Sequence, residues 1–545
     1  MRKILLILSI CSVCHFCVAQ EFDTIRDDTR NGTDSCYVLK KDFIDDIIIF
    51  YNSTCERYSI KILLSDEGVS QVSALSHSIV HFIQMDTIPI KIPIWLAYVS
   101  LYAFEPTIYG YDWDGTFLLG DDNTFSIKFD RSFLLHHPTF LEQLEHLKMK
   151  YDFVTLIDRD PAVRGTGKYR IMKDSKGNKP PKGTVPLSVA DMEFKTAPCV
   201  IEAIKAEADF GLWGYHRLTD NFREACCNWM KTRHNWEIKP EWIVPFEQVV
   251  PALYCAVWTF TEPGDGILVQ TPDYHHFTGA TEKTGRKVIE NRLVADEKGH
   301  YTIDWADFEE KAKQSKMFFL CSPQNPTGRV WTEEELKKMG DICNKHGVFV
   351  CVDEIHHDLI QPGYKHIPYA SLGKEYADNC LVCTSLSKTF NLAGLCYASI
   401  IVPNDEIRAK FTKQALQAFM HIERFGPVAH EAAYRNGAEW LDELILVIKD
   451  NYEYTRDFFK KNFPGVVVTE LEGTYLVWCD FRCFGLSDLE MKNFLTDECN
   501  LYLDNGTEFG AAGSGYQRIN VACPKSILVD ALDRFLVAAQ KRGLK

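Results

Sequence analysis

The sequence has neither an excess of basic residues nor the biased composition of a disordered or collagen-like protein. Its 545 residues contain 60 basic and 75 acidic side chains, which gives a formal net charge of −15 and a pI near 5.6. Such a chain repels phosphate backbones and anionic membrane surfaces, so we expect no nucleic-acid partner. Hydrophobic residues make up 46% and charged residues 25%, which excludes a disordered or collagen-like chain.

Long apolar runs are also scarce. The most apolar internal stretch, residues 88–109, is interrupted by three prolines and two charged residues, so we predict no membrane span in the mature chain. Residues 1–19 differ, because Arg2 and Lys3 precede an apolar run that ends in Cys17-Val18-Ala19, a pattern typical of a secretory signal peptide. A working signal would place the protein in the secretory pathway or outside the cell; otherwise we expect it in the cytoplasm.

Cysteines are few before residue 150 and frequent after it. Beyond the signal-like segment, the first part holds only Cys36 and Cys55, which would fit one disulfide in a secreted protein. The 14 cysteines from Cys199 to Cys523 include several in apolar strand-like runs and are expected to be small buried hydrophobes. Cys380 and Cys383 form a CxxC pair without an opposing CxxC or histidine pair, so we predict no metal site.

The length suggests several structural units, and the composition shifts near residue 150. Residues 20–150 hold strand-like alternations at 58–62 and 125–129, but no cluster with recognisable chemistry, so their fold and function stay open. The sequence has glycosylation sequons at Asn31, Asn52 and Asn505.

Residues 151–545 alternate between strand and helix patterns. The run 251–260 is helix-like, whereas 266–272, 317–323 and 348–355 are strand-like. A helix is predicted from Glu333 to Lys345, because Thr332 and Glu335 form a capping box and Gly347 stops the helix. This alternation of strands and helices predicts an α/β fold with a mainly parallel sheet.

Polar residues follow three strand-like runs. Asn325 comes after the run 317–321, Asp353 and His356 come after the run 348–352, and Lys388 comes after the run 380–383, with Ser385 and Ser387 beside it. In open α/β sheets, ligands bind beyond the carboxyl ends of the strands. A lysine near hydroxyl and backbone donors is what a pyridoxal 5′-phosphate (PLP) site requires.

In this order and spacing the motifs resemble the class I/II aminotransferases, which are fold-type I PLP enzymes. Their aspartate precedes the lysine by about 30 residues, and here the gap is 388 − 353 = 35. Eight segments narrow the resemblance to the MalY/PatB branch of cystathionine β-lyases: VADMEF (189–194), WGYHR (213–217), TPDYHHF (271–277), CSPQNPTGRVWT (321–332), VDEIHHD (352–358), SLSKTFN (385–391), FGAAGSGYQRIN (509–520) and ACP (522–524).

The resemblance implies a large PLP domain over about 196–430 and a small α/β domain formed by about 151–195 and 431–545. It also implies a homodimer, because Tyr215 would reach the cofactor phosphate of the partner's site.

The resemblance assigns a role to each remaining site residue. Lys388 would bind the cofactor covalently and then move the substrate's Cα proton. Asp353 would pair with the pyridinium nitrogen, Asn325 and His356 would face the ring's phenolic oxygen, and Tyr274 would lie against the ring. The phosphate would be held by Ser385, Ser387 and the backbone N–H groups of Ala252 and Leu253 at a helix start. Arg518 would bind the substrate α-carboxylate.

These roles imply β-elimination from L-cystathionine or a cysteine S-conjugate, which gives a thiol, pyruvate and ammonia. Two alternatives stay open, namely an aminotransferase of L-amino acids and a regulatory or binding protein that keeps the fold without turnover. The sequence departs from the family pattern at Ser188, where a tryptophan is usual, and at Cys396, where aspartate aminotransferases have a phosphate-binding arginine.

Overall fold

The computed structural model describes residues 149–159, 164–180, 183–418 and 422–544 with their side chains, and the backbone of six strands between Thr24 and Phe129. The chain divides into two compact units, residues 1–150 and 151–545. The signal-like segment, Asn31 and Cys55 lie outside the described residues. The disulfide expected between Cys36 and Cys55 therefore stays a prediction.

The described strands of the first unit form one antiparallel sheet in the order β1-β2-β3-β4-β6-β5. The two alternations found in the sequence are direct neighbours in it, with Ile60 opposite Ile127. Asn52, the asparagine of the second sequon, ends β3. The strands are β1 (Thr24–Arg26), β2 (Ser35–Lys41), β3 (Ile44–Asn52), β4 (Arg57–Leu64), β5 (Phe117–Leu119) and β6 (Thr124–Phe129).

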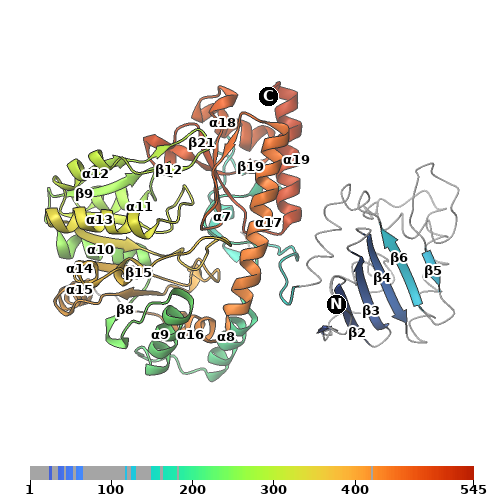
Figure 1. Ribbon diagram of the computed structural model, residues 1–545, viewed down its shortest axis with the longest axis horizontal. Coiled ribbons are helices and arrows are strands. Elements are labelled where there is room, and N and C mark those ends of the chain that lie inside the picture. The colour runs from blue at the N-terminus through green and yellow to red at the C-terminus, as the bar shows by residue number, and fades with distance from the viewer. Residues whose placement is uncertain are drawn as a thin grey trace. The chain divides into compact units, whose positions relative to one another are not determined.

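The second unit is built on a seven-stranded sheet with the order β10-β9-β13-β14-β15-β16-β8 (Figure 1). The first five strands are parallel, and β16 is antiparallel to both β15 and β8, so β8 runs in the direction of the first five. The predicted α/β fold with a mainly parallel sheet is confirmed. The strands are β8 (Ile243–Phe246), β9 (Gly266–Thr271), β10 (Lys287–Arg292), β13 (Met317–Cys321), β14 (Phe349–Asp353), β15 (Cys380–Thr384) and β16 (Ala398–Ile401).

Helices pack around this sheet because their apolar residues recur at helical spacing. In α13 the capping box of Thr332 and Glu335 is formed and Gly347 ends the helix in the left-handed conformation, as the sequence predicts. The helices up to residue 436 are α7 (Gly167–Arg170), α8 (Pro198–Phe210), α9 (Asp220–His234), α10 (Val249–Phe260), α11 (His276–Lys283), α12 (Trp305–Ala312), α13 (Glu333–His346), α14 (Lys374–Ala377), α15 (Asp405–Gln417) and α16 (Phe425–Asn436).

The C-terminal part forms a smaller α/β layer. Its antiparallel sheet has the order β17-β18-β21-β20, and the long helix α17 contacts both α16 and α19 (Figure 1). A two-stranded parallel sheet pairs β7 with β19 and so joins residues near 185 to this layer. The elements are β7 (Val185–Pro186), α17 (Ala438–Asn462), β17 (Val467–Val468), β18 (Leu476–Asp480), α18 (Asp488–Asn493), β19 (Leu501–Tyr502), β20 (Asp504–Asn505), β21 (Tyr516–Asn520) and α19 (Lys525–Arg542).

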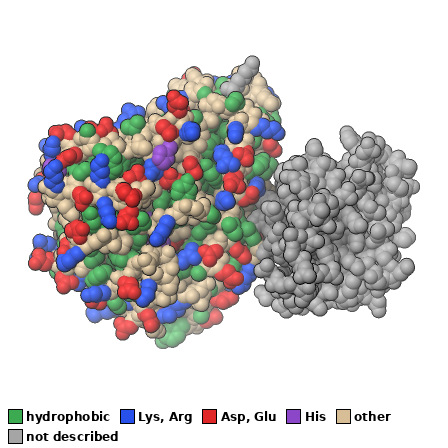
Figure 2. Space-filling model, viewed as in Figure 1, with side chains coloured by type: hydrophobic (Ala, Val, Ile, Leu, Met, Phe, Trp, Pro, Cys, Tyr) green, Lys and Arg blue, Asp and Glu red, His purple; other side chains and the backbone are tan. Residues whose placement is uncertain are grey.

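The main core lies between the large sheet and α10, α11 and α15. Cys351 and Cys383 are fully buried in it, which confirms that strand cysteines here act as small hydrophobes. No helix among the described residues is long and apolar enough to span a bilayer. On the described part of the face drawn in Figure 2, acidic and basic side chains are interspersed.

Candidate active site

Three strands of the parallel sheet end side by side. Cys321, the last residue of β13, lies opposite Asp353, the last residue of β14, and Asp353 lies opposite Cys383 near the end of β15. Because the strands are parallel, the loops that follow them start from one edge. The sheet therefore brings the loops that carry Asn325, His356 and Lys388 to the same rim.

Lys388 is held against the segment 188–194. Its Nζ donates to the backbone oxygen of Ala190 at 2.8 Å. Burial lowers the pKa of the Lys388 amine to about 8, with help from the charge of Arg518 and against the carboxylates of Asp191 and Asp353. An amine with this pKa is partly unprotonated at neutral pH and can act as a nucleophile or base.

Asp353 is a buried carboxylate at the end of β14, with 3% of its surface exposed. Its Oδ1 accepts a hydrogen bond from the backbone N–H of Ile355 at 3.1 Å. Burial raises the pKa of Asp353 to about 7, against this hydrogen bond and the charge of Lys388. Among the described residues no lysine or arginine forms an ion pair with it, so it can take a cationic ring nitrogen as partner.

Arg518, on β21, is held on two sides. Its Nε donates to Asp504 Oδ2 at 3.0 Å, one terminal nitrogen donates to the same oxygen, and the other donates to Asn325 Oδ1 at 2.8 Å. The guanidinium also lies 4.5 Å from the ring centroid of Phe509. The structure thus joins two predicted site residues, Asn325 and Arg518, and adds Asp504, which the sequence did not single out.

His356 and Tyr274 also lie among these groups. His356 is 3% exposed, and its buried Nδ1 makes no hydrogen bond to any described residue. Burial and the charges of Lys388 and Arg518 hold the pKa of His356 well below its usual value. Burial and the carboxylate of Asp353 raise the pKa of Tyr274. Both rings are therefore neutral at physiological pH, and His356 presents an unused buried nitrogen.

The helix start predicted for phosphate binding is shifted. Helix α10 begins at Val249, two residues before Pro251, because proline fits the first turn of a helix. Ala252 and Leu253 are then the fourth and fifth residues of the helix, where backbone N–H groups form hydrogen bonds within the helix. The free N–H groups of this helix are those of Val249 and its neighbours, and not those of Ala252 and Leu253 as we had expected.

The two predicted phosphate-binding serines differ in their surroundings. Ser385 is 2% exposed; its Oγ donates to the backbone oxygen of Tyr397 at 2.7 Å and accepts from the backbone N–H of Ser387 at 3.1 Å. Ser387 itself is half-buried. The Ser385 hydroxyl thus shapes the turn before Lys388.

Cys396 and Tyr215 lie at different places. Cys396 has a left-handed backbone (φ 46°), and its Sγ lies 3.2 Å from Nε2 of Gln248, the residue before α10. Tyr215 is fully exposed in the segment between α8 and α9, together with Trp213 and Leu212. Among the described residues, no hydrogen bond, ion pair or ring contact joins Tyr215 to the loop that carries Lys388. Ser188, the other departure from the family pattern, is buried with an unbonded hydroxyl.

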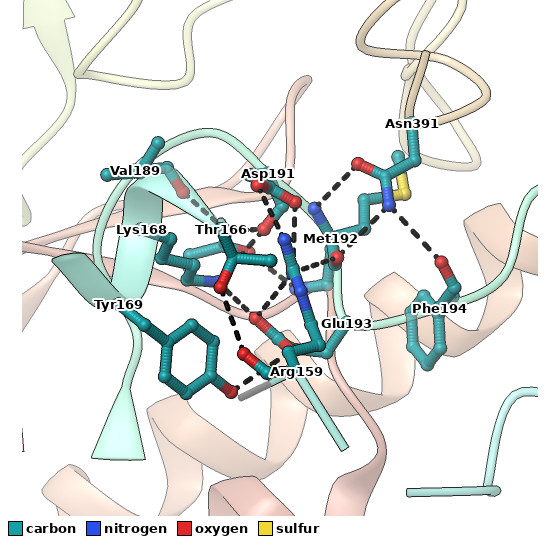
Figure 3. A network of polar contacts seen from close by, with 12 residues as sticks. Arg159, Thr166, Lys168, Tyr169, Val189, Asp191, Met192, Glu193, Phe194 and Asn391 are labelled. Carbon is teal, nitrogen blue, oxygen red and sulfur yellow. Dashed lines mark hydrogen bonds and ion pairs between the residues drawn. The ribbon is translucent and has the colours of Figure 1, made fainter. Parts of the chain in front are cut away.

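The segment 188–194 is clamped from several sides (Figure 3). Arg159 binds the carboxylate of Asp191 with two hydrogen bonds, at 3.1 and 2.9 Å. Asn391, three residues after Lys388, donates to the backbone oxygens of Met192 and Phe194 and accepts from the N–H of Met192. Sequence reasoning missed Arg159 and Asn391 as supports of the lysine's hydrogen-bond partner.

Comparison with known proteins places this site in a family. Residues 182–535 match the family described as aminotransferase class I and II. The chain therefore belongs to that family, and within it to the group that contains the PatB and MalY proteins.

Two curated relatives illustrate the similarity. The chain is 40% identical to cystathionine beta-lyase PatB of Bacillus subtilis over 357 residues, which covers 65% of this chain and 92% of PatB. It is 33% identical to protein MalY of Escherichia coli, with 63% and 88% coverage.

Solved structures show the same relationship. The crystal structure of cystalysin from Treponema denticola, which contains a PLP cofactor, superposes with a TM-score of 0.70 at 39% identity and covers 72% of this chain and all of that one. The PLP-bound C–S lyase from Staphylococcus hominis gives 0.66 at 29% identity, with 72% and 98% coverage. The second unit is thus a fold-type I structure over nearly its whole length.

Proposed function

We propose that the protein is a PLP-dependent carbon–sulfur lyase that cleaves the Cβ–S bond of L-cystathionine or of another cysteine S-conjugate. The products would be a thiol, pyruvate and ammonia. The observation that carries the proposal is the half-buried Lys388, with a pKa lowered to about 8, among Asp353, Asn325 and Arg518 in a chain 40% identical to a cystathionine β-lyase.

The residues present fit the cofactor. Asp353 is buried without a lysine or arginine partner among the described residues, and His356 has an unbonded buried nitrogen. The start of α10 has no acidic residue and no side-chain cap, so its free N–H groups suit a phosphate. When bound, PLP supplies an electron sink for negative charge at the substrate's Cα.

Arg518 would bind and orient the substrate. A guanidinium has five N–H groups, and Asp504 and Asn325 use three of them, so 5 − 3 = 2 remain. One remains on each terminal nitrogen, which suits a carboxylate held by two parallel hydrogen bonds. The substrate α-carboxylate is therefore fixed beside Asn325.

Lys388 would move the proton. Its unprotonated Nζ takes the proton from Cα, and the oxygen of Ala190, 2.8 Å away, accepts from the resulting ammonium. Asp353 would stay anionic opposite the cofactor's ring nitrogen and keep that nitrogen protonated. His356, neutral because of burial, would face the cofactor's phenolic oxygen beside Asn325.

The test is pyruvate release from L-cystathionine by the purified full chain loaded with PLP, with Lys388→Ala beside it. We expect pyruvate from the wild type and none from the variant. The aminotransferase alternative predicts instead that a supplied keto acid is converted to its amino acid without pyruvate release from cystathionine. A protein that binds PLP and does neither reaction would support a regulatory role.

Two further proposals concern the assembly and the compartment. The exposed Leu212, Trp213 and Tyr215 support a homodimer in which Tyr215 reaches the phosphate of the partner's site. The signal-like segment supports entry into the secretory pathway, and cleavage after Ala19, detected by N-terminal sequencing of the protein from its natural cells, tests it. An intact N-terminus in the cytoplasm would contradict it.

A further inference from the structure

The turn after β14 carries a second group of buried titratable side chains with no role in the steps above. Each of these five side chains is 8% exposed or less: His234, His357, His366, Asp358 and Glu354. The ring centroid of His357 lies 4.5 Å from that of His234 and 6.0 Å from that of His366. The group comes from α9, from the turn itself and from the loop that follows it.

Asp358 is the centre of this group. Its Oδ1 accepts from Trp229 Nε1 at 3.0 Å and from His234 Nε2 at 2.8 Å, and its Oδ2 accepts from Thr389 Oγ1 at 2.9 Å. His357 and His234 hold the pKa of Asp358 well below its usual value, against burial. Asp358 is therefore an anion in the interior.

The two buried carboxylates need a positive charge. The described part of the chain has no lysine or arginine within ion-pair distance of Asp358 or Glu354; their ion-pair neighbours are histidines. An uncompensated buried carboxylate is costly, so at least one of these histidines must be charged.

The geometry selects His357. Its Nδ1 lies 2.5 Å from the backbone oxygen of Glu354, and its Nε2 lies 3.3 Å from Asp358 Oδ2, an ion-pair distance without good hydrogen-bond alignment. Both ring nitrogens thus face acceptors, whereas a neutral imidazole has only one N–H to give. The carboxylates of Asp358 and Glu354 accordingly raise the pKa of His357 despite its burial.

The neighbouring histidine behaves differently. Burial, and then the charge of His357, lower the pKa of His234 to about 4. Its Nε2 still donates to Asp358, which a neutral imidazole can do. His366 faces Glu354 Oε2 at 3.3 Å. Of the two histidines on the Asp358 carboxylate, His357 therefore carries the charge and His234 is neutral.

The charged pair lies next to both key site residues in the chain. Thr389, bound to Asp358, directly follows Lys388, and His357 lies four residues after Asp353 in a turn closed by the bond from the His357 N–H to the Glu354 oxygen at 2.9 Å. Burial and the carboxylate of Glu354 raise the pKa of Asp353, and the charge of His357 acts in the opposite direction, together with that of Lys388.

We propose that His357 is a positively charged positioning residue, which keeps Asp353 anionic and, through Asp358 and Thr389, fixes the turn of Asp353 to the loop of Lys388. This inference rests on the proposed function, because Asp353 is the carboxylate that would meet the cofactor's ring nitrogen. It assigns the cluster an electrostatic role in cofactor binding rather than a role in contact with substrate.

The test compares His357→Gln with His234→Gln in the full chain. Both variants replace an imidazole on the Asp358 carboxylate with an amide donor, but only the first removes a charge. In the wild type, PLP affinity should weaken at acid pH as Asp353 gains a proton. With His357→Gln this loss should move to higher pH, because a neighbouring cation lowers a carboxyl pKa. His234→Gln should keep the wild-type profile, and His357→Lys should restore it.

A second measurement does not depend on turnover. Nitrogen NMR of the ¹⁵N-histidine-labelled wild type should show one imidazole with both nitrogens protonated from pH 6 to 8, and His357→Gln should lack it. A neutral His357, or equal shifts with both glutamine variants, would overturn the proposal. The proposal would also be overturned if the wild type bound one equivalent of a divalent metal and His357→Gln did not. Nitrogen and oxygen atoms of His234, His357 and Asp358 lie within 4.8 Å of one another, a spacing at which they could hold a metal ion. If no pyruvate were released, the proposed lyase function would be wrong, but the NMR and affinity results would still decide this inference.

Discussion

Asp504 and Arg518 lie directly opposite each other on the antiparallel strands β20 and β21, and Asp504 Oδ2 accepts from Nε of Arg518 at 3.0 Å. Asp504 also accepts from the backbone N–H of Val189, at 3.1 and 3.0 Å to its two oxygens. One carboxylate therefore fixes both the guanidinium proposed to bind substrate and the segment that holds Lys388. The site is organised around a residue that has no role in the chemistry itself.

Asp504→Asn should raise KM for cystathionine about ten- to a hundredfold, with a smaller effect on kcat. The reason is that a hydrogen bond to a charged group contributes about 1.5–3 kcal/mol, and 1.4 kcal/mol corresponds to a factor of ten. Steady-state kinetics of pyruvate release measure both constants. Asp530→Asn is the matched control, because Asp530 pairs with Arg534 on the exposed face of α19 and should leave KM unchanged. A KM that does not move with Asp504→Asn would show that Arg518 is not the carboxylate-binding group.

The rate at which PLP binds to cofactor-free protein should rise with pH and level off above pH 8. Only the unprotonated amine attacks an aldehyde, and burial lowers the pKa of Lys388 to about 8. Stopped-flow absorbance between pH 6 and 10 measures this rate. A rate that keeps climbing to pH 10 would mean that the amine has the pKa of an ordinary exposed lysine, near 10.4.

The sequence predicts the frame of this site well, for physical reasons. Strand ends in a parallel sheet converge, so Asn325, Asp353 and Lys388 could be placed at one rim from their positions after apolar runs. The capping box at Thr332 predicts a helix start because both of its hydrogen bonds are local. Elements that are specified by local hydrogen bonds can therefore be predicted without knowledge of the tertiary structure.

Long-range partners could not be predicted in the same way. Strand β20 has only two residues, too few for a hydrophobic alternation, so nothing in the sequence placed Asp504 opposite Arg518. Arg159 and Asp191 meet across 32 residues, and only their opposite charges hint at it. The sequence predicts that α10 begins after Pro251, whereas Pro251 is the third residue of the helix, because proline is tolerated in the first turn.

Acid should destabilise the second unit, residues 151–545, partly through His430. This imidazole is fully buried, its Nδ1 lies 2.9 Å from the oxygen of Gly426, and burial lowers its pKa to about 4. An unfolded chain binds the proton near pH 6.5, so between pH 6.5 and 4 the unfolded state holds more protons and stability falls as pH falls. The contribution is about 3 kcal/mol at most, since each pKa unit corresponds to about 1.4 kcal/mol.

Urea unfolding of the wild type and of His430→Gln at pH 7 and pH 4.5 tests this. The variant should be less stable at pH 7, but its loss of unfolding free energy on acidification should be smaller than that of the wild type. Equal acid sensitivity in the His430 variant would assign the effect to other groups.

Two inactive variants should restore activity when they share a dimer. If Tyr215 acts in the partner's site, a mixed dimer of Lys388→Ala and Tyr215→Ala has one site with both residues intact and one with neither. Random reassembly of equal amounts makes half of the dimers mixed, so about a quarter of the wild-type activity should return. The measurement is pyruvate release after the two purified variants are unfolded and refolded together, beside each variant refolded alone. If the mixture shows no gain although light scattering confirms dimers, Tyr215 works within its own chain or not at all, and the exposed segment 212–215 serves another contact.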